Sequence, residues 1–482
     1  MAINKIKLFG NTKIVCTIGP ASESVSRLTE LIQAGMDVAR LNFSHGGHSE
    51  HLKVLQNIRQ AGAKTGEAIT VLQDLSGPKI RTGVVKNHHV ELSEGQDFVF
   101  TVQDIVGDEQ RVSTTYKTLP KDVQKGDTIL VDDGKIKMVV KSKTKTDVRC
   151  EVLNGGTLKD KKGMNLPGVR VSASSLTEKD RIDLKFGLKN DIDYVALSFV
   201  RKAEDIRELR SLIIREGKKG IKIPIVAKIE KPEAIENIDS IIGESDVIMV
   251  ARGDLGVELP PEEVPLIQKM IVRKCNEAGK PVIIATQMLE SMIENPRPTR
   301  AEANDVANAV LDGADAVMLS AETSVGAYPV EAVHTMDKII QRAETAQHDR
   351  LGSGFEIRNN DMFDAVARAA AVLARQLNAR AIVPITHSGS TAVRISKYRP
   401  SAPILAITGR ERILRRLNLV WGVRGMILPE LDVDSDTAFQ HIEAELIKRG
   451  YVQKGDYVVF TAGIPLMSKG TTNTIKVEQV GR

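Results

Sequence analysis

Two carboxylates and a lysine stand at the ends of two consecutive apolar segments. Lys228 and Glu230 end the first segment, and Asp254 directly follows the second. Residues two apart on a strand point to the same face, so Lys228 and Glu230 share a face while Ile229 points to the other. Two carboxylates from neighbouring strands, with positions left for water and substrate oxygens, suit Mg²⁺ or Mn²⁺ better than zinc, which prefers histidine and cysteine.

The same spacing also fits a purely structural arrangement. An ion pair between Lys228 and a carboxylate at a strand end would produce this pattern, and the spacing alone favours neither interpretation. Gly253 and Gly256 flank Asp254. Glycines allow close backbone approach with exposed N–H groups that can hold a carboxylate or phosphate, although a Gly-x-x-Gly spacing by itself more often marks only a turn.

Polar residues also alternate along an earlier segment. Arg40, Asn42 and Ser44 fall on one face of a strand there, and Leu41 and Phe43 fall on the other. Polar groups inside a barrel need partners. A satisfied buried network explains the pattern as well as an arginine that clamps a phosphate beside oxygen ligands.

Two later segments end in polar residues as well. Thr286 and Gln287 end one of them, and Ser320 and Glu322 end the other. These residues would add hydroxyl and carboxylate groups to the same end of a barrel, but any of them could instead cap a loop.

The elements that must position these residues follow a regular alternation. Eight short apolar segments rich in β-branched residues lie at 12–18, 38–43, 69–75, 194–200, 224–230, 247–253, 281–287 and 316–322. Segments with the 3.6-residue period of a one-sided helix follow most of them, for example at 24–34, 49–63, 202–216, 262–278 and 329–344. This alternation predicts an α/β fold with a (β/α)₈ TIM barrel, whose active site lies at the C-terminal ends of the strands.

Two stretches depart from that alternation. Between residues 81 and about 168 the chain has short strands, turn signals and little helical periodicity, which predicts an inserted all-β domain that can act as a lid. After a Gly-containing stretch at 351–356 a new βα series begins, with strands near 381–386, 404–408, 425–429 and 457–463. We predict a separate C-terminal α/β doubly wound domain.

The predicted domain limits follow from these departures. We predict the barrel at residues 1–82 and 168–350, an inserted β-barrel lid at 83–167 and the C-terminal domain at 351–482.

Composition excludes several classes of protein. The chain has 482 residues with 42% hydrophobic and 27% charged residues, which is typical of globular domains. Its 67 basic and 62 acidic residues give a net charge of +5, too small a surplus to indicate nucleic-acid binding. No apolar run is long enough for a membrane helix. Three widely spaced cysteines fit neither a disulfide framework nor a zinc site, so we expect a cytoplasmic protein.

Taken together, the motifs resemble those of the pyruvate kinase family, and the resemblance runs from about Thr12 to the C-terminus. The motifs that carry it are Arg40-Leu-Asn-Phe-Ser-His-Gly46, Lys228-Ile-Glu230, Met249-Val-Ala-Arg-Gly-Asp-Leu-Gly-Val-Glu258, Ala285-Thr-Gln-Met-Leu-Glu-Ser-Met292 and Asn295-Pro-Arg-Pro-Thr-Arg-Ala-Glu302. The resemblance implies a barrel domain, a lid and a C-terminal regulatory domain, usually in a homotetramer. It also implies phosphoryl transfer from phosphoenolpyruvate to ADP, which gives pyruvate and ATP at the end of glycolysis.

The resemblance assigns roles to the residues of the barrel. Glu230 and Asp254 would bind Mg²⁺ or Mn²⁺, and Lys228 would neutralise charge on the phosphoryl group and the enolate oxygen. The backbone amides of Gly253 and Asp254 would bind the substrate carboxylate. Thr286 would contact that carboxylate and stand near the proton path to the enolate carbon. A further residue, Arg40, would lie near the phosphates.

The nucleotide and a monovalent cation have their own implied ligands. Lys162, delivered by the lid, and Arg81 on the barrel side would bind ADP or ATP. Members of the family that require K⁺ commonly have Thr-Lys-Gly-Pro-Glu where this chain has Leu75-Ser-Gly-Pro-Lys79. The ammonium of Lys79 could therefore replace K⁺ in its pocket, and we expect activity without K⁺. The pocket residues of the family correspond to Asn42, Ser44, Asp74 and Leu75.

A loop in the C-terminal domain resembles the effector loop of the family. In the segment 386–392 a strand passes into a helix, where hydroxyls and amides could bind a phosphorylated effector. The implied effector residues are Thr386, Ser388, Ser390 and Thr391, with the segment 470–474 nearby. A simple Ser/Thr helix cap without a ligand is the alternative.

Two other functions fit part of the sequence. A barrel lyase or aldolase that stabilises pyruvate enolate with Mg²⁺ would share the carboxylate pair, but it would not need the nucleotide contacts of Arg81 and Lys162. A non-catalytic sensor of sugar phosphates would be expected to have lost Lys228, Glu230 or Asp254, and all three are present.

Overall fold

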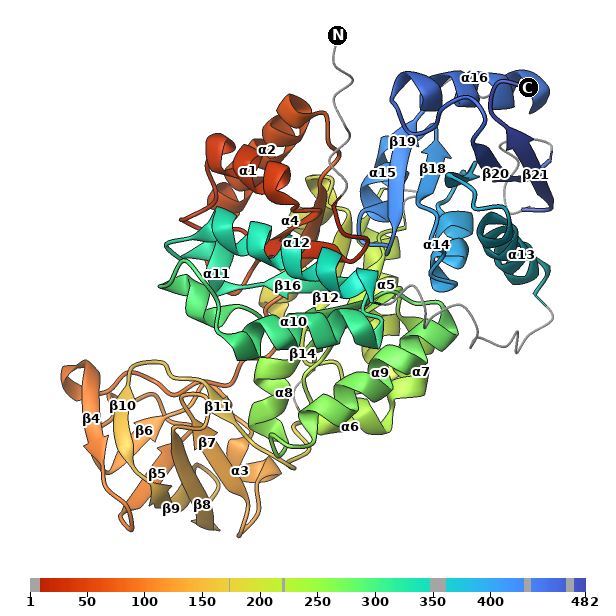
Figure 1. Ribbon diagram of the computed structural model, residues 1–482. Coiled ribbons are helices and arrows are strands. Elements are labelled where there is room, and N and C mark those ends of the chain that lie inside the picture. The colour runs from red at the N-terminus through yellow and green to blue at the C-terminus, as the bar shows by residue number, and fades with distance from the viewer. Residues whose placement is uncertain (1–8, 173, 219–221, 347–360, 429–434, 465–471) are drawn as a thin grey trace.

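Eight parallel strands close into a barrel at the centre of the molecule (Figure 1). The computed structural model describes residues 9–172, 174–218, 222–346, 361–428, 435–464 and 472–482. The barrel order is β1-β16-β15-β14-β13-β12-β3-β2. The strands are β1 Lys13–Thr17, β2 Val38–Asn42, β3 Thr70–Asp74, β12 Tyr194–Leu197, β13 Ile225–Ile229, β14 Val247–Ala251, β15 Val282–Ala285 and β16 Ala316–Leu319. Each lies within one of the eight predicted segments, which confirms the predicted barrel.

Helices surround the barrel on its outside. They are α1 Val25–Ala34, α2 His48–Thr65, α4 Glu178–Lys189, α5 Ala203–Glu216, α9 Val264–Ala278, α10 Arg300–Asp312 and α12 Pro329–Thr345, with the shorter α6 Pro232–Glu236, α7 Ile238–Glu244, α8 Arg252–Glu258 and α11 Ala321–Ser324. Strand alternation sorts the side chains between two layers. Ile225, Ala227 and Ile229 join the cluster between strands and helices, while Val226 joins the cluster inside the barrel. Lys228 therefore points inward, as the pattern predicted.

The inserted domain follows β3 and contains two sheets. Its strands are β4 His89–Leu92, β5 Asp97–Thr101, β6 Arg111–Ser113, β7 Thr128–Val131, β8 Ile136–Lys143, β9 Asp147–Asn154, β10 Gly156–Lys159 and β11 Met164–Asn165. A six-stranded sheet has the order β11-β7-β8-β9-β5-β6, and β10 pairs with β4 alone. Among the described residues neither sheet closes on itself, so the insert is an all-β domain, as predicted, with the form of a half-barrel. The domain also contains a single helical turn, α3 Leu119–Asp122, and the 3₁₀ turn η1 Lys86–His88.

The C-terminal domain has a five-stranded sheet with the order β19-β18-β17-β20-β21. Its elements are α13 Met362–Gln376, β17 Ala381–Pro384, α14 Ser390–Lys397, β18 Ile404–Thr408, α15 Glu411–Leu417, β19 Val423–Ile427, α16 Ser435–Lys448, β20 Tyr457–Ala462 and β21 Thr474–Gln479. Apolar clusters cover both faces, one with α16 and one with α13 and α14, as a doubly wound domain requires. The last strand, β21, runs antiparallel to β20 and was not predicted. The predicted domain boundary at 350/351 and the stretch 351–356 lie outside the described residues.

The β insert and the C-terminal domain lie on opposite sides of the barrel (Figure 1). The insert continues from the C-terminal end of β3. The C-terminal domain contacts the N-terminal ends of the strands, where Tyr194 Oη donates to the carbonyl of Arg416 at 2.9 Å. Leu419, which follows α15, is fully buried in the cluster inside the barrel and closes that end.

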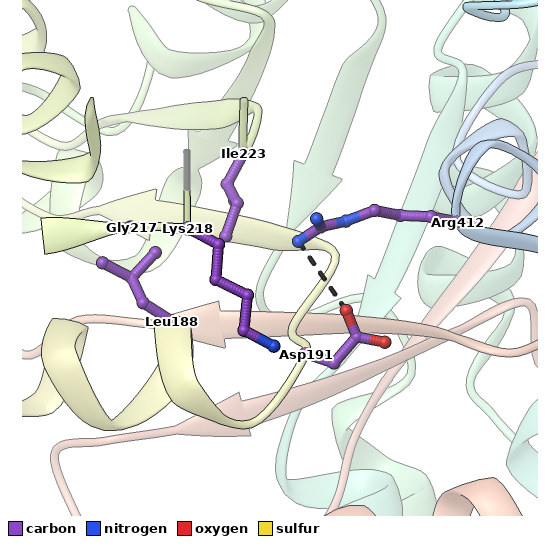
Figure 2. Close-up of a pocket in the computed structure, with 6 residues that line it drawn as sticks. All are labelled: Leu188, Asp191, Gly217, Lys218, Ile223 and Arg412. Carbon is purple, nitrogen blue, oxygen red and sulfur yellow. Dashed lines mark ion pairs between the residues drawn. The ribbon is translucent and has the colours of Figure 1, made fainter. Parts of the chain in front are cut away.

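A small pocket lies where α15 meets the barrel domain (Figure 2). Lys218 and Asp191 line it from the barrel side and Arg412 from α15, with 3.7 Å between the Arg412 guanidinium and the Asp191 carboxylate. The pocket leaves about 20 Å³ of free space, which is room for roughly one water molecule. It therefore belongs to the contact between the domains and is too small for a substrate.

Candidate active site

Lys228 lies inside the barrel among acidic and polar groups from three neighbouring strands. Its Nζ is 2.8 Å from Glu230 Oε1 and 3.4 Å from Asp74 Oδ1, and it donates to Ser198 Oγ at 2.7 Å. Burial alone would lower the pKa of Lys228, but the carboxylates of Asp74 and Glu230 outweigh it and raise that pKa above its usual value. Lys228 is thus a fixed, buried cation at the C-terminal end of the barrel.

Glu230 follows β13 and is almost completely buried. Its Oε2 accepts a hydrogen bond from the Phe199 amide at 2.7 Å. Burial raises the pKa of Glu230, Lys228 opposes this shift, and the negative charge of Asp254 adds to it. Asp254 lies in the first turn of α8, directly after β14, and is half-buried. β13 and β14 are paired with Ile229 opposite Val250, so Glu230 and Asp254 both follow the C-terminal ends of neighbouring strands.

Glu230 and Asp254 are the side chains at this site that could act as ligands of a divalent metal. Among the described residues no group of three or more histidine, cysteine, aspartate or glutamate side chains could hold a metal ion. Two carboxylates such as Glu230 and Asp254 would suit a hard cation that keeps water and substrate oxygens as its other ligands. Glu230 and Asp254 fit Mg²⁺ or Mn²⁺ in this respect, whereas a closed zinc site would need more protein ligands.

Arg40 on β2 forms a second charged pair inside the barrel. Its Nε donates to Asp74 Oδ2 at 2.7 Å and one terminal nitrogen donates to Thr17 Oγ1 at 2.9 Å. Burial would raise the pKa of Asp74, but Lys228 and Arg40 lower it below its usual value. Asp74 therefore stays ionised between two cations and links Arg40 to Lys228.

The residues predicted for a monovalent cation lie along the ends of β2 and β3. Ser44 donates its amide to Asn42 Oδ1 at 3.1 Å and its hydroxyl to Ser76 Oγ at 3.2 Å. The Leu75 carbonyl accepts from Ser198 Oγ at 2.8 Å. Asn42 and Asp74 occupy paired positions on the neighbouring strands β2 and β3. These oxygens thus belong to the same end of the barrel as Lys228.

Lys79 lies close enough to this region to interact with its charges. Partial burial and the positive charge of Lys228 lower the pKa of Lys79, while Asp254, Glu230 and Asp74 act in the opposite direction. Taken as a whole residue, Lys79 is nevertheless exposed to solvent. The sequence-based expectation that Lys79 brings a positive charge to this end of the barrel is therefore compatible with its position.

Thr286 and Gly253 lie against each other at the ends of β15 and β14. The Gly253 amide donates to Thr286 Oγ1 at 2.7 Å, and Thr286 has a left-handed backbone with φ of 72°. A side chain at Gly253 would place its Cβ 3.3 Å from Thr286 Oγ1. The close approach of these two residues therefore explains why glycine stands at 253.

The residues predicted to bind nucleotide lie together where the β insert joins the barrel. Arg81 forms an antiparallel bridge with Gly163, and the Arg81 guanidinium donates to the Lys161 carbonyl at 3.0 Å. The Lys162 ammonium is 2.8 Å from Asp132 Oδ1 within the insert. Both cations are thus brought to the junction, and Lys162 is held by an acid of the insert.

The predicted effector residues form a compact turn before α14. Thr386 Oγ1 accepts from the Gly389 amide at 2.9 Å, and Ser388 and Ser390 hydroxyls lie 3.0 Å apart. Thr391 Oγ1 lies 2.6 Å from Thr472 Oγ1, so the described part of the segment 470–474 is nearby, as expected. Residues 470 and 471 lie outside the described residues.

Sequence reasoning missed several residues at the site and left one open. Ser198, which contacts Lys228, follows β12 and lies two positions after the inward-facing Ala196, so alternation could have identified it. No sequence signal marked Phe199 as the donor to Glu230. Glu322, left open between a site residue and a cap, accepts from the amides of Leu289 and Ser320 and is a buried cap.

Comparisons with known proteins agree with this geometry. A family model described as "Pyruvate kinase, barrel domain" matches residues 9–333, and one described as "Pyruvate kinase, alpha/beta domain" matches residues 364–478. The chain is 50% identical over 473 residues to a pyruvate kinase of Geobacillus stearothermophilus, covering 97% of this chain and 80% of that protein. It is 48% identical over 474 residues to a pyruvate kinase of Staphylococcus haemolyticus, covering 98% and 80%.

A solved structure extends the agreement to the whole fold. The crystal structure of a pyruvate kinase from Cryptosporidium parvum superposes with a TM-score of 0.91 at 41% identity, covering 98% of this chain and 96% of that one. The chain belongs to the pyruvate kinase family and is a phosphotransferase.

Proposed function

We propose that this chain transfers the phosphoryl group of phosphoenolpyruvate to ADP with Lys228, Arg40 and Thr286 as its catalytic side chains. The observation that carries the assignment is the buried Lys228 ammonium, 2.8 Å from Glu230 and 3.4 Å from Asp74. A preorganised cation in a site with little water stabilises charge that develops on an enolate oxygen and a transferring phosphoryl group. The raised pKa of Lys228 supports this role because the cation persists at neutral pH.

Glu230 and Asp254 are proposed to hold Mg²⁺ or Mn²⁺. Their carboxylates follow the ends of the paired strands β13 and β14, and hard oxygen ligands of this kind support a metal that takes its other ligands from water and substrate. When bound, such an ion would neutralise part of the negative charge of the substrate and the transferring phosphoryl group. The amides of Gly253 and Asp254 would bind the substrate carboxylate, beside the Thr286 hydroxyl. Arg40 would contact the phosphate.

The β insert is proposed to act as a lid that brings Lys162 to the nucleotide. Arg81 and Lys162 lie at the junction between the insert and the barrel, where a hinge motion would move them toward or away from the site. A nucleotide site is needed for phosphoryl transfer but not for an enolate lyase. Dependence of pyruvate formation on ADP therefore separates the two functions.

Lys79 is proposed to replace K⁺ in the pocket of Asn42, Ser44, Asp74 and Leu75. Burial and Lys228 lower the pKa of Lys79, but Asp254, Glu230 and Asp74 act in the opposite direction, and this attraction to three carboxylates supports the assignment. Turnover in K⁺-free buffer tests it.

The C-terminal loop is proposed to bind a phosphorylated small molecule that regulates the enzyme. Hydroxyls of Thr386, Ser388, Ser390 and Thr391 support this role because they gather at the start of α14. We further propose a homotetramer and a cytoplasmic location, in line with the family resemblance. Within the described ranges, no helix combines the length and apolar character needed to cross a bilayer.

A coupled assay with phosphoenolpyruvate, ADP and Mg²⁺ tests the proposal. We expect ADP-dependent turnover in the native enzyme. In Lys228→Met we expect kcat to fall by at least about 10²-fold, because a preorganised charge at the transition state is lost. Lys228→Arg keeps a positive charge at the same buried position and serves as the control for loss of that charge. A folded Lys228→Met with near-native kcat would contradict the assignment.

The fold of that variant must be checked separately. Removing the ammonium leaves Asp74 and Glu230 with fewer partners inside the barrel, which costs about 3–5 kcal/mol for a buried pair. Circular dichroism at the assay temperature shows whether the variant is folded. A non-catalytic sensor would give no turnover even in the native chain.

A further inference from the structure

The side chain of Arg252 joins three elements at the C-terminal end of the barrel. Arg252 is the first residue of α8 and directly follows β14. One terminal nitrogen is 2.7 Å from Asp305 Oδ1 on α10, and the other donates to the Thr286 carbonyl at 2.7 Å. The side chain is 11% exposed, so these bonds lie mostly out of water.

The backbone that Arg252 holds is unusual. Thr286 has φ of 72° and Gln287 has φ of 54°, both in the left-handed region. This region is unfavourable for a β-branched residue such as threonine and persists only where surrounding contacts enforce it. A charged donor on the Thr286 carbonyl is such a contact, because it fixes the peptide group between the two left-handed residues.

The residues that follow β14 also hold the Thr286 hydroxyl. Oγ1 accepts from the Gly253 amide at 2.7 Å and lies 2.5 Å from the Ala285 carbonyl, to which it donates. Ala251 and Ala285 are register partners on β14 and β15, so residues 252 and 253 leave the barrel beside 286. Consecutive residues of one strand end thus hold both the carbonyl and the hydroxyl of Thr286.

We propose that Arg252, anchored by Asp305, is a positioning residue that holds the Thr286 backbone where the Thr286 hydroxyl can pass a proton to the enolate. The inference rests on the proposed role of Thr286 near the proton path. In that step the Thr286 hydroxyl turns from the Ala285 carbonyl, and its O–H bond breaks as a C–H bond forms at C3 of enolpyruvate. The C=C bond becomes single, the enolate oxygen becomes the ketone carbonyl, and a proton from solvent restores the Thr286 hydroxyl. The reverse step removes a methyl proton from pyruvate, which exchanges with solvent.

Exchange of the pyruvate methyl hydrogens for deuterium measures this step directly. The enzyme is incubated with pyruvate, ATP and Mg²⁺ in D₂O, and the methyl signal is followed by proton NMR. In Arg252→Met we expect exchange to slow by about 10- to 100-fold, the size of effect that a small misplacement of a catalytic group produces. The KM for phosphoenolpyruvate should change much less than kcat.

A double-mutant comparison separates positioning from a general structural effect. If Arg252 acts through Thr286, the double variant Arg252→Met with Thr286→Ala should exchange no more slowly than Thr286→Ala alone. Multiplicative losses would overturn the proposal. Asp305→Asn should reproduce part of the loss, and Arg27→Met, which removes an exposed ion pair with Glu30 on α1, should leave exchange unchanged.

Chemical rescue tests whether the missing guanidinium group itself causes the slow exchange. Arg252→Ala should regain part of its exchange rate when guanidinium is added at millimolar concentration, while methylammonium should restore less because it cannot bridge two acceptors. Rescue that is equal for both cations, or absent in a folded variant, would overturn the proposal.

The outcomes also distinguish this inference from the proposed function. No turnover of phosphoenolpyruvate and ADP by the native chain would reject the proposed function itself. Normal exchange in Thr286→Ala would reject the role of Thr286 and the inference with it. Slow exchange in Thr286→Ala with normal exchange in Arg252→Met would reject the inference alone.

Discussion

At the scale of single residues, the proposed replacement of K⁺ by Lys79 depends on the charge of that lysine. The pKa of Lys79 is lowered by burial and by Lys228. Its folded pKa therefore lies below the usual one, so the ammonium is lost as the pH rises through that lowered pKa, at a lower pH than in a free lysine. Lys228 keeps its charge over the same range because its pKa is raised. The two lysines should thus titrate separately.

This separation predicts a K⁺ effect that appears only at alkaline pH. At neutral pH, turnover in choline chloride should match turnover in KCl at equal ionic strength. Toward the lowered pKa of Lys79, activity in choline should fall and K⁺ should restore it. Steady-state kcat in the two salts across the pH range measures this. Strong stimulation of the native enzyme by K⁺ at pH 7 would contradict the prediction.

Replacement of Lys79 provides the matched test. Lys79→Glu should require K⁺ already at neutral pH, because the positive charge is replaced by a negative one. Lys79→Met removes the charge without adding a carboxylate and should show a smaller dependence. Equal K⁺ responses in all three proteins would show that Lys79 has no part in the monovalent pocket.

At the scale of elements, the β insert controls where Lys162 can reach. Asp132 lies just after β7 and Lys162 just before β11, and their ion pair joins these two neighbouring strands. The hydrogen bond from Lys162 is the main reason that the pKa of Asp132 is lowered. A lid that delivers Lys162 to a nucleotide must weaken this pair. Under the proposed role of Lys162, Asp132 would compete with the nucleotide phosphates for the same ammonium.

Asp132→Asn should weaken that competition. Asparagine tolerates the left-handed backbone at this position, where φ is 54°, so the fold of the turn should persist. A partly exposed ion pair contributes about 0.2–1 kcal/mol, so the KM for ADP should fall by roughly 1.4- to fivefold. Steady-state kinetics with varied ADP measures it.

Asp104→Asn is the control, because it removes an exposed ion pair with Lys117 in the same domain. It should leave the KM for ADP unchanged. An unchanged or higher KM in Asp132→Asn would show that Asp132 does not compete for Lys162.

At the scale of the whole molecule, the C-terminal domain completes the barrel. Leu419 fills the inside of the barrel at the end opposite the active site. Arg415 lies 2.7 Å from the fully buried Asp193, just before β12, and the Arg415 carbonyl accepts a hydrogen bond from Thr70. The barrel core therefore includes a side chain from another domain. This arrangement couples unfolding of the barrel to undocking of the C-terminal domain.

Leu419→Ala tests how much this contact between the domains contributes to stability. The substitution leaves a cavity inside the barrel and should reduce the free energy of unfolding by about 2–5 kcal/mol. Leu419→Met fills a similar volume and should cost less than about 1.5 kcal/mol. Urea unfolding followed by circular dichroism measures both. A loss in Leu419→Ala no larger than in Leu419→Met would show that this contact adds little to stability.

The sequence by itself determined the barrel and the direction of its site residues. Strand alternation is local, so Lys228 and Glu230 had to share a face once residues 225–229 formed a strand. The eight βα units follow from short apolar runs and helical periods that each lie within one segment. The family motifs then pointed to the chemistry. None of these steps needed contacts between distant parts of the chain.

Only the tertiary structure decided which groups meet across those segments. Ser198 against Lys228, Lys162 against Asp132, Arg252 against Thr286 and Leu419 inside the barrel all join residues at least 30 positions apart. The open sheets of the insert and the antiparallel β21 likewise depend on which strands pair. Such contacts are set by packing and electrostatics of the folded chain, which spacing along the sequence does not encode.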